Sequence, residues 1–150
     1  LIVKGEEVTL MSWGNVIVDD ITVDADTGLV VSMSARMNLD GDFKRTEKKL
    51  TWLSADPNPL VSVRLLDYDY LITKKKLEEN DSFEDCLTPV TEFVTEAVGE
   101  AAMAALVKGD IVQLERKGFY IVDSVSKNGS TSALSLIYIP DGTTKSHASK

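Results

Sequence analysis

Apolar and polar residues alternate along most of this chain, so its side chains repeat with a period of two rather than of 3.6. Alternation of this kind predicts strands with one buried face and one solvated face. The predicted strands cover residues 8–10, 15–18, 21–23, 29–33, 50–53, 61–65, 110–115, 119–122 and 134–139. Short strands separated by turns are typical of barrels and sandwiches, so the sequence predicts a mainly β fold.

Some segments depart from the strand pattern. Residues 24–28 and 116–118 combine charged residues with glycine and are expected to close two hairpins. The alanine-rich residues 96–108 end before Gly109, which predicts a short helix with a glycine stop.

The remaining polar stretches are expected at the surface. Residues 74–88 read as a surface excursion that contains one helical turn, 82–87, capped by Ser82. Residues 126–132 are expected to form a flexible loop, and residues 143–150 a loose polar tail.

Composition narrows the class of protein. The 150 residues are 43% hydrophobic and 27% charged, as in soluble globular proteins, and no apolar run approaches the roughly 20 residues of a membrane-spanning helix. A net charge of −8 excludes a protein that coats nucleic acid by bulk attraction. Local basic clusters remain at 44–49, 74–76 and 116–117, two of them close to aromatic residues. Recognition of single-stranded RNA needs this mixture.

Other chemistry is excluded by residues that the chain lacks. Cys86 and His147 are its only cysteine and histidine, so we expect no internal disulfide, no zinc site of the usual composition and no nucleophilic triad. This cysteine usage indicates a reducing, intracellular compartment. No glycine-rich nucleotide-binding fingerprint occurs. The acidic groups at 24–26 and 38–42 lack the last glutamate of a calcium loop, so we expect solvated turns and no metal.

Three segments carry more specific information. They are residues 48–53 (KKLTWL), 63–76 (VRLLDYDYLITKKK) and 108–123 (KGDIVQLERKGFYIVD), and they are followed by 136–142 (LIYIPDG). In this order they closely resemble the C-terminal anticodon-binding region of cytosolic glutamyl-tRNA synthetases of the archaeal and eukaryotic type. The resemblance extends to the related glutaminyl-tRNA synthetases and covers nearly the whole chain.

The resemblance implies an architecture of two small β-barrels with one or two short helices. Residues 1–65 are similar to the distal anticodon-binding barrel, residues 66–142 to the returning strands and helix of the proximal barrel, and 143–150 form the tail. No segment resembles the catalytic domain of this class I synthetase, which holds ATP and Mg²⁺. Because the chain also begins at Leu1 without a methionine, we expect a part of a longer cytoplasmic protein that carries no active site and no cofactor of its own.

The resemblance also implies a binding site. In the glutaminyl relatives the Gln and Arg that match Gln113 and Arg116 lie close to the central anticodon base, and Lys117 and Tyr120 belong to the same hairpin. A Gln amide and an Arg fork satisfy the two acceptors and one donor of a uracil edge. Strand alternation places Gln113 and Arg116 on opposite faces unless the turn bends the strand. Tyr120 or Trp13 would stack on bases.

Phosphate contacts are expected from loop cations, namely Lys44, Arg45, Lys48, Lys49 and Lys74. Two arginines of the glutaminyl relatives are Thr9 and Met11 here, so recognition of the first anticodon base is not transferred. Arg64 matches a family arginine, and a position at the edge of the core or an ion pair with Asp67 or Asp69 is an equal interpretation of it.

Two functions therefore compete. The first is an RNA-binding module that positions the tRNA for glutamate for ATP-dependent attachment of the amino acid by the catalytic domain. The alternative is a protein-interaction scaffold of a translation complex, in which acidic faces and residues 74–96 dock other translation proteins. Altered anticodon bases distinguish them, because a scaffold shows no preference among tRNAs.

Overall fold

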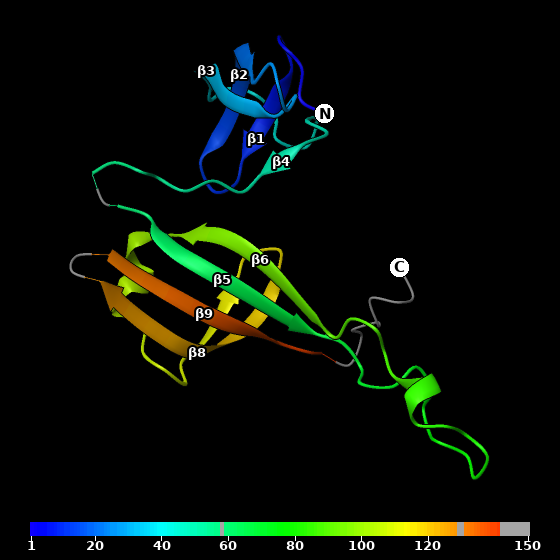
Figure 1. Cartoon of the computed structure of the whole chain (residues 1–150). Helices are drawn as coiled ribbons and strands as arrows, with labels where there is room; N and C mark the ends of the chain where they lie inside the picture. Colours follow the sequence, from blue (N-terminus) through cyan, green and yellow to red (C-terminus); the bar gives the residue numbers. More distant parts are fainter. Residues whose placement is uncertain (58, 129–130, 142–150) are drawn as a thin grey trace. The chain divides into compact units, whose positions relative to one another are not determined.

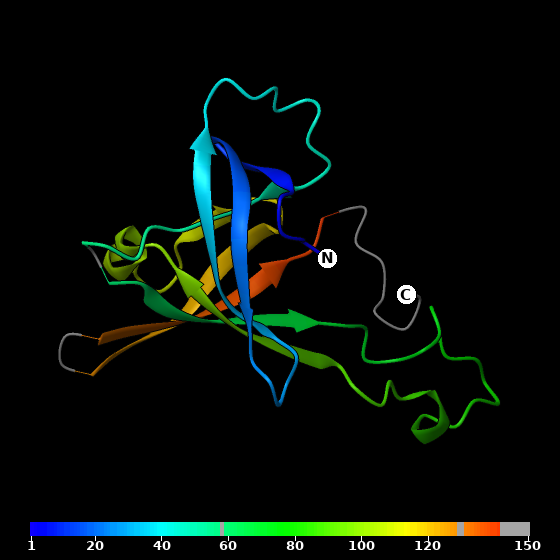
Figure 2. The same ribbon diagram turned by 90° about the horizontal axis from the view of Figure 1, so that it is seen from above.

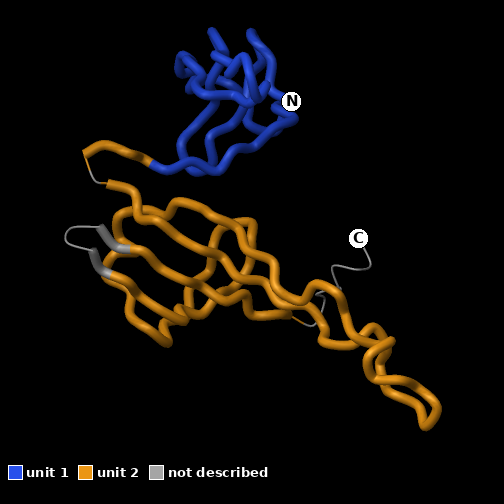
Figure 3. The backbone as a smooth tube through the Cα atoms, in the orientation of Figure 1, with its two compact units in different colours: residues 1–53 blue, residues 54–150 orange. Residues whose placement is uncertain are grey.

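The computed structural model describes residues 1–57, 59–128 and 131–141, and the chain divides into two compact units, Leu1–Leu53 and Ser54–Lys150 (Figure 3). Both units consist of β-structure, which confirms the predicted mainly β class. The described residues contain no α-helix, only two short 3-10 helices. None of their helices has the length and apolar character needed to cross a membrane.

Unit 1 is a four-stranded mixed sheet with the strand order β3-β2-β1-β4 (Figure 1). Its strands are β1 (Glu7–Leu10), β2 (Gly14–Val23), β3 (Val30–Asn38) and β4 (Lys49–Leu50). Strands β1, β2 and β3 pair antiparallel, whereas β4 runs parallel to β1. The predicted hairpin between β2 and β3 is confirmed. A register shift between Val18 and Asp20 lies in β2.

The hydrophobic core of unit 1 is small. It consists of Val8, Val16 and Val18, with four partly buried apolar side chains packed around them. Every residue of β3 except Asn38 is exposed, so this edge strand contributes little to the core. A unit of this size buries little apolar surface, and its polar contacts therefore carry more of its stability.

Unit 2 contains a five-stranded sheet with the order β6-β5-β9-β8-β7 (Figure 1). Its strands are β5 (Val61–Tyr68), β6 (Glu92–Gly99), β7 (Ile111–Leu114), β8 (Gly118–Asn128) and β9 (Thr131–Ile139). All neighbours pair antiparallel except β5 and β9, which are parallel. The strong twist of this sheet is visible in Figure 2.

Strict alternation determines which side chains of unit 2 are buried. In β5 the burial follows the sequence pattern, with Val61, Val63 and Leu65 inside and the residues between them exposed. The central strand β9 contributes Leu134 and Leu136, the most deeply buried leucines of the unit. The opposite face of the sheet is solvated, with Val98 and Phe119 at least half exposed.

The predicted surface excursion is present. Beyond the ends of β5 and β6 the chain extends as a separate arm (Figures 1 and 2), closed by an isolated bridge between Ile72 and Leu87. The arm contains the 3-10 helix η1 (Glu84–Cys86), which places a helical turn where one was predicted. The N-cap residue of η1 is Phe83, and no side chain caps the helix with a hydrogen bond, so the expected cap by Ser82 is wrong. Cys86 is buried.

Three other expectations are corrected. The helix predicted at 96–108 is a strand up to Gly99 followed by the five-residue 3-10 helix η2 (Ala101–Ala105). The strand predicted at 50–53 is reduced to the two residues of β4. The flexible loop predicted at 126–132 is largely strand, because β8 and β9 remain paired as far as Asn128 and Thr131. The expected tail at 143–150 lies outside the described residues. The strand pairing leaves both sheets open rather than closed into the expected barrels.

Truncation of Leu136 tests the position of the core. We expect Leu136→Ala to lower the free energy of unfolding by about 2–5 kcal/mol, because the side chain is fully buried in the central strand. Leu71→Ala is the matched control, since Leu71 is 73% exposed on the arm, and it should change stability by less than about 0.5 kcal/mol. Urea denaturation followed by circular dichroism measures both, and equal losses would contradict this core.

Candidate nucleic-acid interface

The hairpin of β7 and β8 presents the residues expected to read a base. A turn closes it, in which the amide of Lys117 donates to the carbonyl oxygen of Leu114 over 3.0 Å. Arg116 has a φ of 62° and lies in the left-handed region, which favours glycine. Strand β7 ends at Leu114, so Arg116 leaves the strand alternation that would direct it away from Gln113. Both side chains are exposed.

Register decides which aromatic residue lies beside Gln113. Gln113 pairs with Phe119, and both occupy the solvated face of the sheet. Tyr120 pairs with Val112 on the opposite face, where it is 8% exposed and its ring centroid lies 5.4 Å from that of Tyr138. Burial, followed by the charge of Asp67, raises the pKa of the Tyr120 phenol. Phe119 is therefore the ring that the hairpin offers to a ligand, and alternation alone could have identified it.

A series of buried hydrogen bonds holds in place the loop between β3 and β4, which carries Lys44 and Arg45. The hydroxyl oxygens of Thr46 and Thr9 lie 2.5 Å apart, and the Thr9 hydroxyl donates to the Asn15 carbonyl oxygen over 2.8 Å. The Asn15 amide then donates to the Glu7 carboxylate over 2.8 Å. At the other end the Lys49 ammonium donates to both oxygens of Thr46. This series of hydrogen bonds thus runs from the Lys49 ammonium to the Glu7 carboxylate, an arrangement in which the bonds polarise one another.

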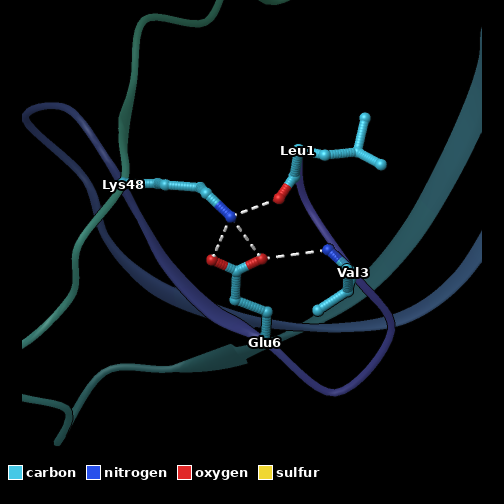
Figure 4. A network of polar contacts seen from close by, with 4 residues as sticks. All are labelled: Leu1, Val3, Glu6 and Lys48. Atoms are coloured by element: carbon cyan, nitrogen blue, oxygen red, sulfur yellow. Dashed lines mark hydrogen bonds and ion pairs between the residues drawn. The ribbon is translucent and has the colours of Figure 1, made fainter.

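Lys48 is also engaged within the protein (Figure 4). Its ammonium lies 2.6 and 2.8 Å from the two carboxylate oxygens of Glu6 and donates to the backbone oxygen of Leu1. The amide of Val3 donates to the same carboxylate over 2.9 Å. The hydrogen bond from Lys48, followed by that from Val3, lowers the pKa of Glu6. Lys48 and Lys49 therefore hold unit 1 together and present little unpaired charge.

Two other expected cations have acidic partners in unit 2. Lys74 forms an ion pair with Asp81 on the arm, and this contact raises the pKa of the ammonium. Arg64 pairs with Glu96, its neighbour on β6, over 2.9 Å and not with the two aspartates that the sequence suggested. In the described part of the molecule Lys44, Arg45 and Lys117 have exposed side chains that take part in no hydrogen bond or ion pair.

The carboxylate of Asp24 is engaged within its own turn. The Asp24 carboxylate accepts hydrogen bonds from the amides of Asp26 and Thr27 and from the Thr27 hydroxyl, and the Thr27 bonds chiefly lower its pKa. Within residues 1–57, 59–128 and 131–141, no three His, Cys, Asp or Glu side chains gather in a geometry for a metal ion.

Comparison with known proteins defines the class to which these features belong. Residues 49–123, half of the chain, match the family described as tRNA synthetases class I (E and Q), anti-codon binding domain. The chain belongs to this family of anticodon-binding domains. The matched region includes the paired residues of the β7–β8 hairpin, 111–121, and the whole arm.

Several similar proteins have glutamate in their names. The chain is 52% identical to a probable cytoplasmic glutamate–tRNA ligase of Schizosaccharomyces pombe over 94% of its length, and 53% identical to the cytoplasmic enzyme of Saccharomyces cerevisiae over 91%. Identity to the cytoplasmic glutamate–tRNA ligase of Arabidopsis thaliana is 49% over 92% of the chain. The chain spans only 18–19% of the length of these relatives.

Removal of Asn15 tests the series of buried hydrogen bonds. We expect Asn15→Ala to lower the free energy of unfolding of unit 1 by about 1–3 kcal/mol, because it leaves buried polar groups without partners. Both tryptophans of the chain, Trp13 and Trp52, lie in unit 1, so their emission during urea denaturation follows this unit. Asn80→Ala on the exposed arm is the control, and an equal effect of the two would contradict the assignment.

The Glu6–Lys48 pair predicts a pH dependence. Because the folded pKa of Glu6 lies below its ordinary value of 4.5, its contribution to stability is present above that value and is lost as the pH falls through the folded pKa. Glu6→Gln should therefore be less stable than the parent at neutral pH, and the difference should shrink in acid. Thermal denaturation between about pH 7 and pH 3 measures it. The exposed Glu47→Gln should show no such convergence, and a constant deficit for Glu6→Gln would refute the mechanism.

Proposed function

We propose that this chain binds the anticodon loop of the tRNA for glutamate as the anticodon-binding part of a cytoplasmic glutamyl-tRNA synthetase. The observation that supports this most is the β7–β8 hairpin, which lies within the family match and presents Gln113, Arg116 and Phe119 to solvent. The relatives are named as cytoplasmic glutamate–tRNA ligases, which supports glutamate as the amino acid and the cytoplasm as the location. The bound tRNA would be positioned for attachment of glutamate.

The two units would correspond to parts of two barrels. Residues 1–65 would correspond to the distal barrel and residues 66–142 to the returning strands of the proximal one, with 143–150 as a tail. Strand β5 (Val61–Tyr68) spans this boundary and pairs within the unit 2 sheet. Strands β6 and β7 are the edges of the unit 2 sheet, so further strands of a longer chain would continue it there. ATP and Mg²⁺ would be held by a catalytic domain and not by this chain.

Base recognition in this proposal uses Gln113 and Arg116. The amide of Gln113 supplies both a donor and an acceptor, and the guanidinium of Arg116 supplies donors only. Together they match the two acceptors and one donor of uracil at the central anticodon position. Phe119 lies beside Gln113 on the same face and would stack against a neighbouring base, in place of Tyr120, whose ring is buried.

Phosphate contacts would come from the cations that the protein leaves available. Lys44 and Arg45 on unit 1, and Lys117 beside Arg116 on unit 2, have no acidic partner among the described residues. Lys48, Lys49 and Lys74 would contribute less, because part of their charge is already balanced inside the protein. Removal of any one of the phosphate-binding cations should reduce the salt dependence of binding by about one unit of slope.

Replacement of Arg116 by glycine tests the base contact without disturbing the turn. Since Arg116 adopts a left-handed φ, Arg116→Gly should leave stability unchanged or raise it by up to about 1 kcal/mol. It should weaken binding of the anticodon stem-loop by about 1–3 kcal/mol and flatten the preference for the central base. Fluorescence anisotropy with labelled stem-loops that differ at that base measures both effects.

Arg64→Ala is the matched control for this experiment. Arg64 lies in the same unit and is paired with Glu96, so its removal should change neither affinity nor base preference by more than about twofold. A parent chain that binds all stem-loops equally would refute the proposed function and favour the scaffold. A parent that discriminates while Arg116→Gly does so equally well would refute only the assignment of Arg116.

A further inference from the structure

Two tryptophans form an exposed pair on unit 1. The ring centroids of Trp13 and Trp52 lie 4.6 Å apart, with an angle of 38° between the ring planes. The two residues are 55% and 39% exposed, although tryptophan is among the residues that bury the most area in a core. They are also the only tryptophans of the chain. The pair therefore presents a large aromatic surface to solvent.

The backbone holds both rings in place. The amide of Trp13 donates to the carbonyl oxygen of Leu10 over 3.1 Å in the turn after β1, and Ser12 in this turn has a left-handed φ of 61°. The indole N–H of Trp52 donates to the backbone oxygen of Met11 over 2.8 Å. The Trp52 ring is thus held by a hydrogen bond and Trp13 packs against it, so binding would cost little side-chain ordering.

The same hydrogen bond determines what the pair can recognise. Because the indole N–H of Trp52 is used within the turn, that ring offers its faces and edges and no polar group to a ligand. The Trp52 ring therefore stacks with any planar π-system and does not itself select by hydrogen bonding, whereas the indole N–H of Trp13 forms no hydrogen bond among the described residues. Nucleobases stack on aromatic rings in this way regardless of their sequence.

Cationic groups lie a short distance along the chain. β1 and β4 are parallel neighbours, so the segments that carry Trp13 and Trp52 emerge from the same end of this pair of strands. Lys49, at the start of β4, precedes Trp52 by three residues, which is at most about 10 Å of extended chain. The unpaired side chains of Lys44 and Arg45 belong to the loop that enters β4 at its opposite end, eight and seven residues before Trp52.

We propose that Trp13 and Trp52 form a stacking platform for an unpaired base of the tRNA anticodon loop, with Lys44 and Arg45 available to phosphates farther along the loop. The inference rests on the proposed function and adds a second contact region, on the other unit from the base-reading hairpin. We favour RNA over a protein partner here, because its phosphates are attracted to Lys44 and Arg45 and its bases can stack on the exposed rings. Stacking on this platform contributes affinity without choosing the base.

The chain carries its own reporter for this contact. Since both tryptophans belong to the pair, titration with the anticodon stem-loop should change the tryptophan emission and should give the same dissociation constant as anisotropy. Trp13→Ala should weaken binding by about 5- to 100-fold, whereas Trp13→Phe retains a ring and should lose less than about fivefold. The slope of affinity against salt should be unchanged in both variants, because stacking releases no counterions.

Stem-loops with one abasic position at a time identify the stacked nucleotide. At that position, removal of the base should weaken binding by the parent but not weaken binding by Trp13→Ala any further. Phe83→Ala, which removes an exposed aromatic ring from the arm, is the control and should leave affinity unchanged. Thermal denaturation confirms that each variant is folded, and Trp13→Phe keeps the test decisive if the alanine variant is unstable.

The outcomes separate the two proposals. If the parent distinguishes anticodon bases but its emission is unchanged at saturation, or both Trp13 variants bind as the parent does, the platform is refuted and the proposed function stands. If Trp13→Ala binds more weakly but prefers the same central base as the parent to the same degree, the result supports a platform that adds affinity alone. A parent that does not bind the stem-loop refutes both proposals.

Discussion

The hydrogen-bonded chain from Lys49 to Glu7 is the contact on which the rest of unit 1 depends. Three buried valines form the core of this unit, so the loop that follows β3 has little apolar surface to pack against. The buried hydroxyl of Thr46 attaches the loop to β1, and Asn15 carries the connection to the carboxylate at the start of that strand. A network of this kind favours one conformation strongly, because each unmade bond leaves a buried polar atom unsatisfied.

The same contacts divide the basic residues into two groups. Lys48 and Lys49 neutralise acidic groups or hydrogen-bond to the loop backbone, whereas Lys44 and Arg45 remain at the surface. A protein with a net charge of −8 can therefore offer positive charge at a few chosen points. The acidic surroundings repel polyanions that approach elsewhere, which favours a ligand whose shape brings its phosphates to those points.

Local patterns predicted the fold where burial follows a strict alternation. The side chains of Val61, Val63 and Leu65 are buried as expected, and the same rule applied to β7 and β8 places Gln113 beside Phe119. The alanines after residue 96 misled the prediction, because helix propensity is weaker than eight consecutive pairings of β6 with β5. The partners of Lys48 and Trp52 lie about 40 residues away in sequence, and no local pattern reveals such contacts.

The parallel pairing of β5 with β9 has a consequence for the order of folding. Ser62 pairs with Ala133, 71 residues later, so the central part of the unit 2 sheet is completed only after β9 has been synthesised. Every pairing in unit 1 lies within its first 50 residues. During synthesis unit 1 is therefore able to fold on the ribosome first, while β5 and β6 wait as an incomplete sheet whose edge is open to wrong partners.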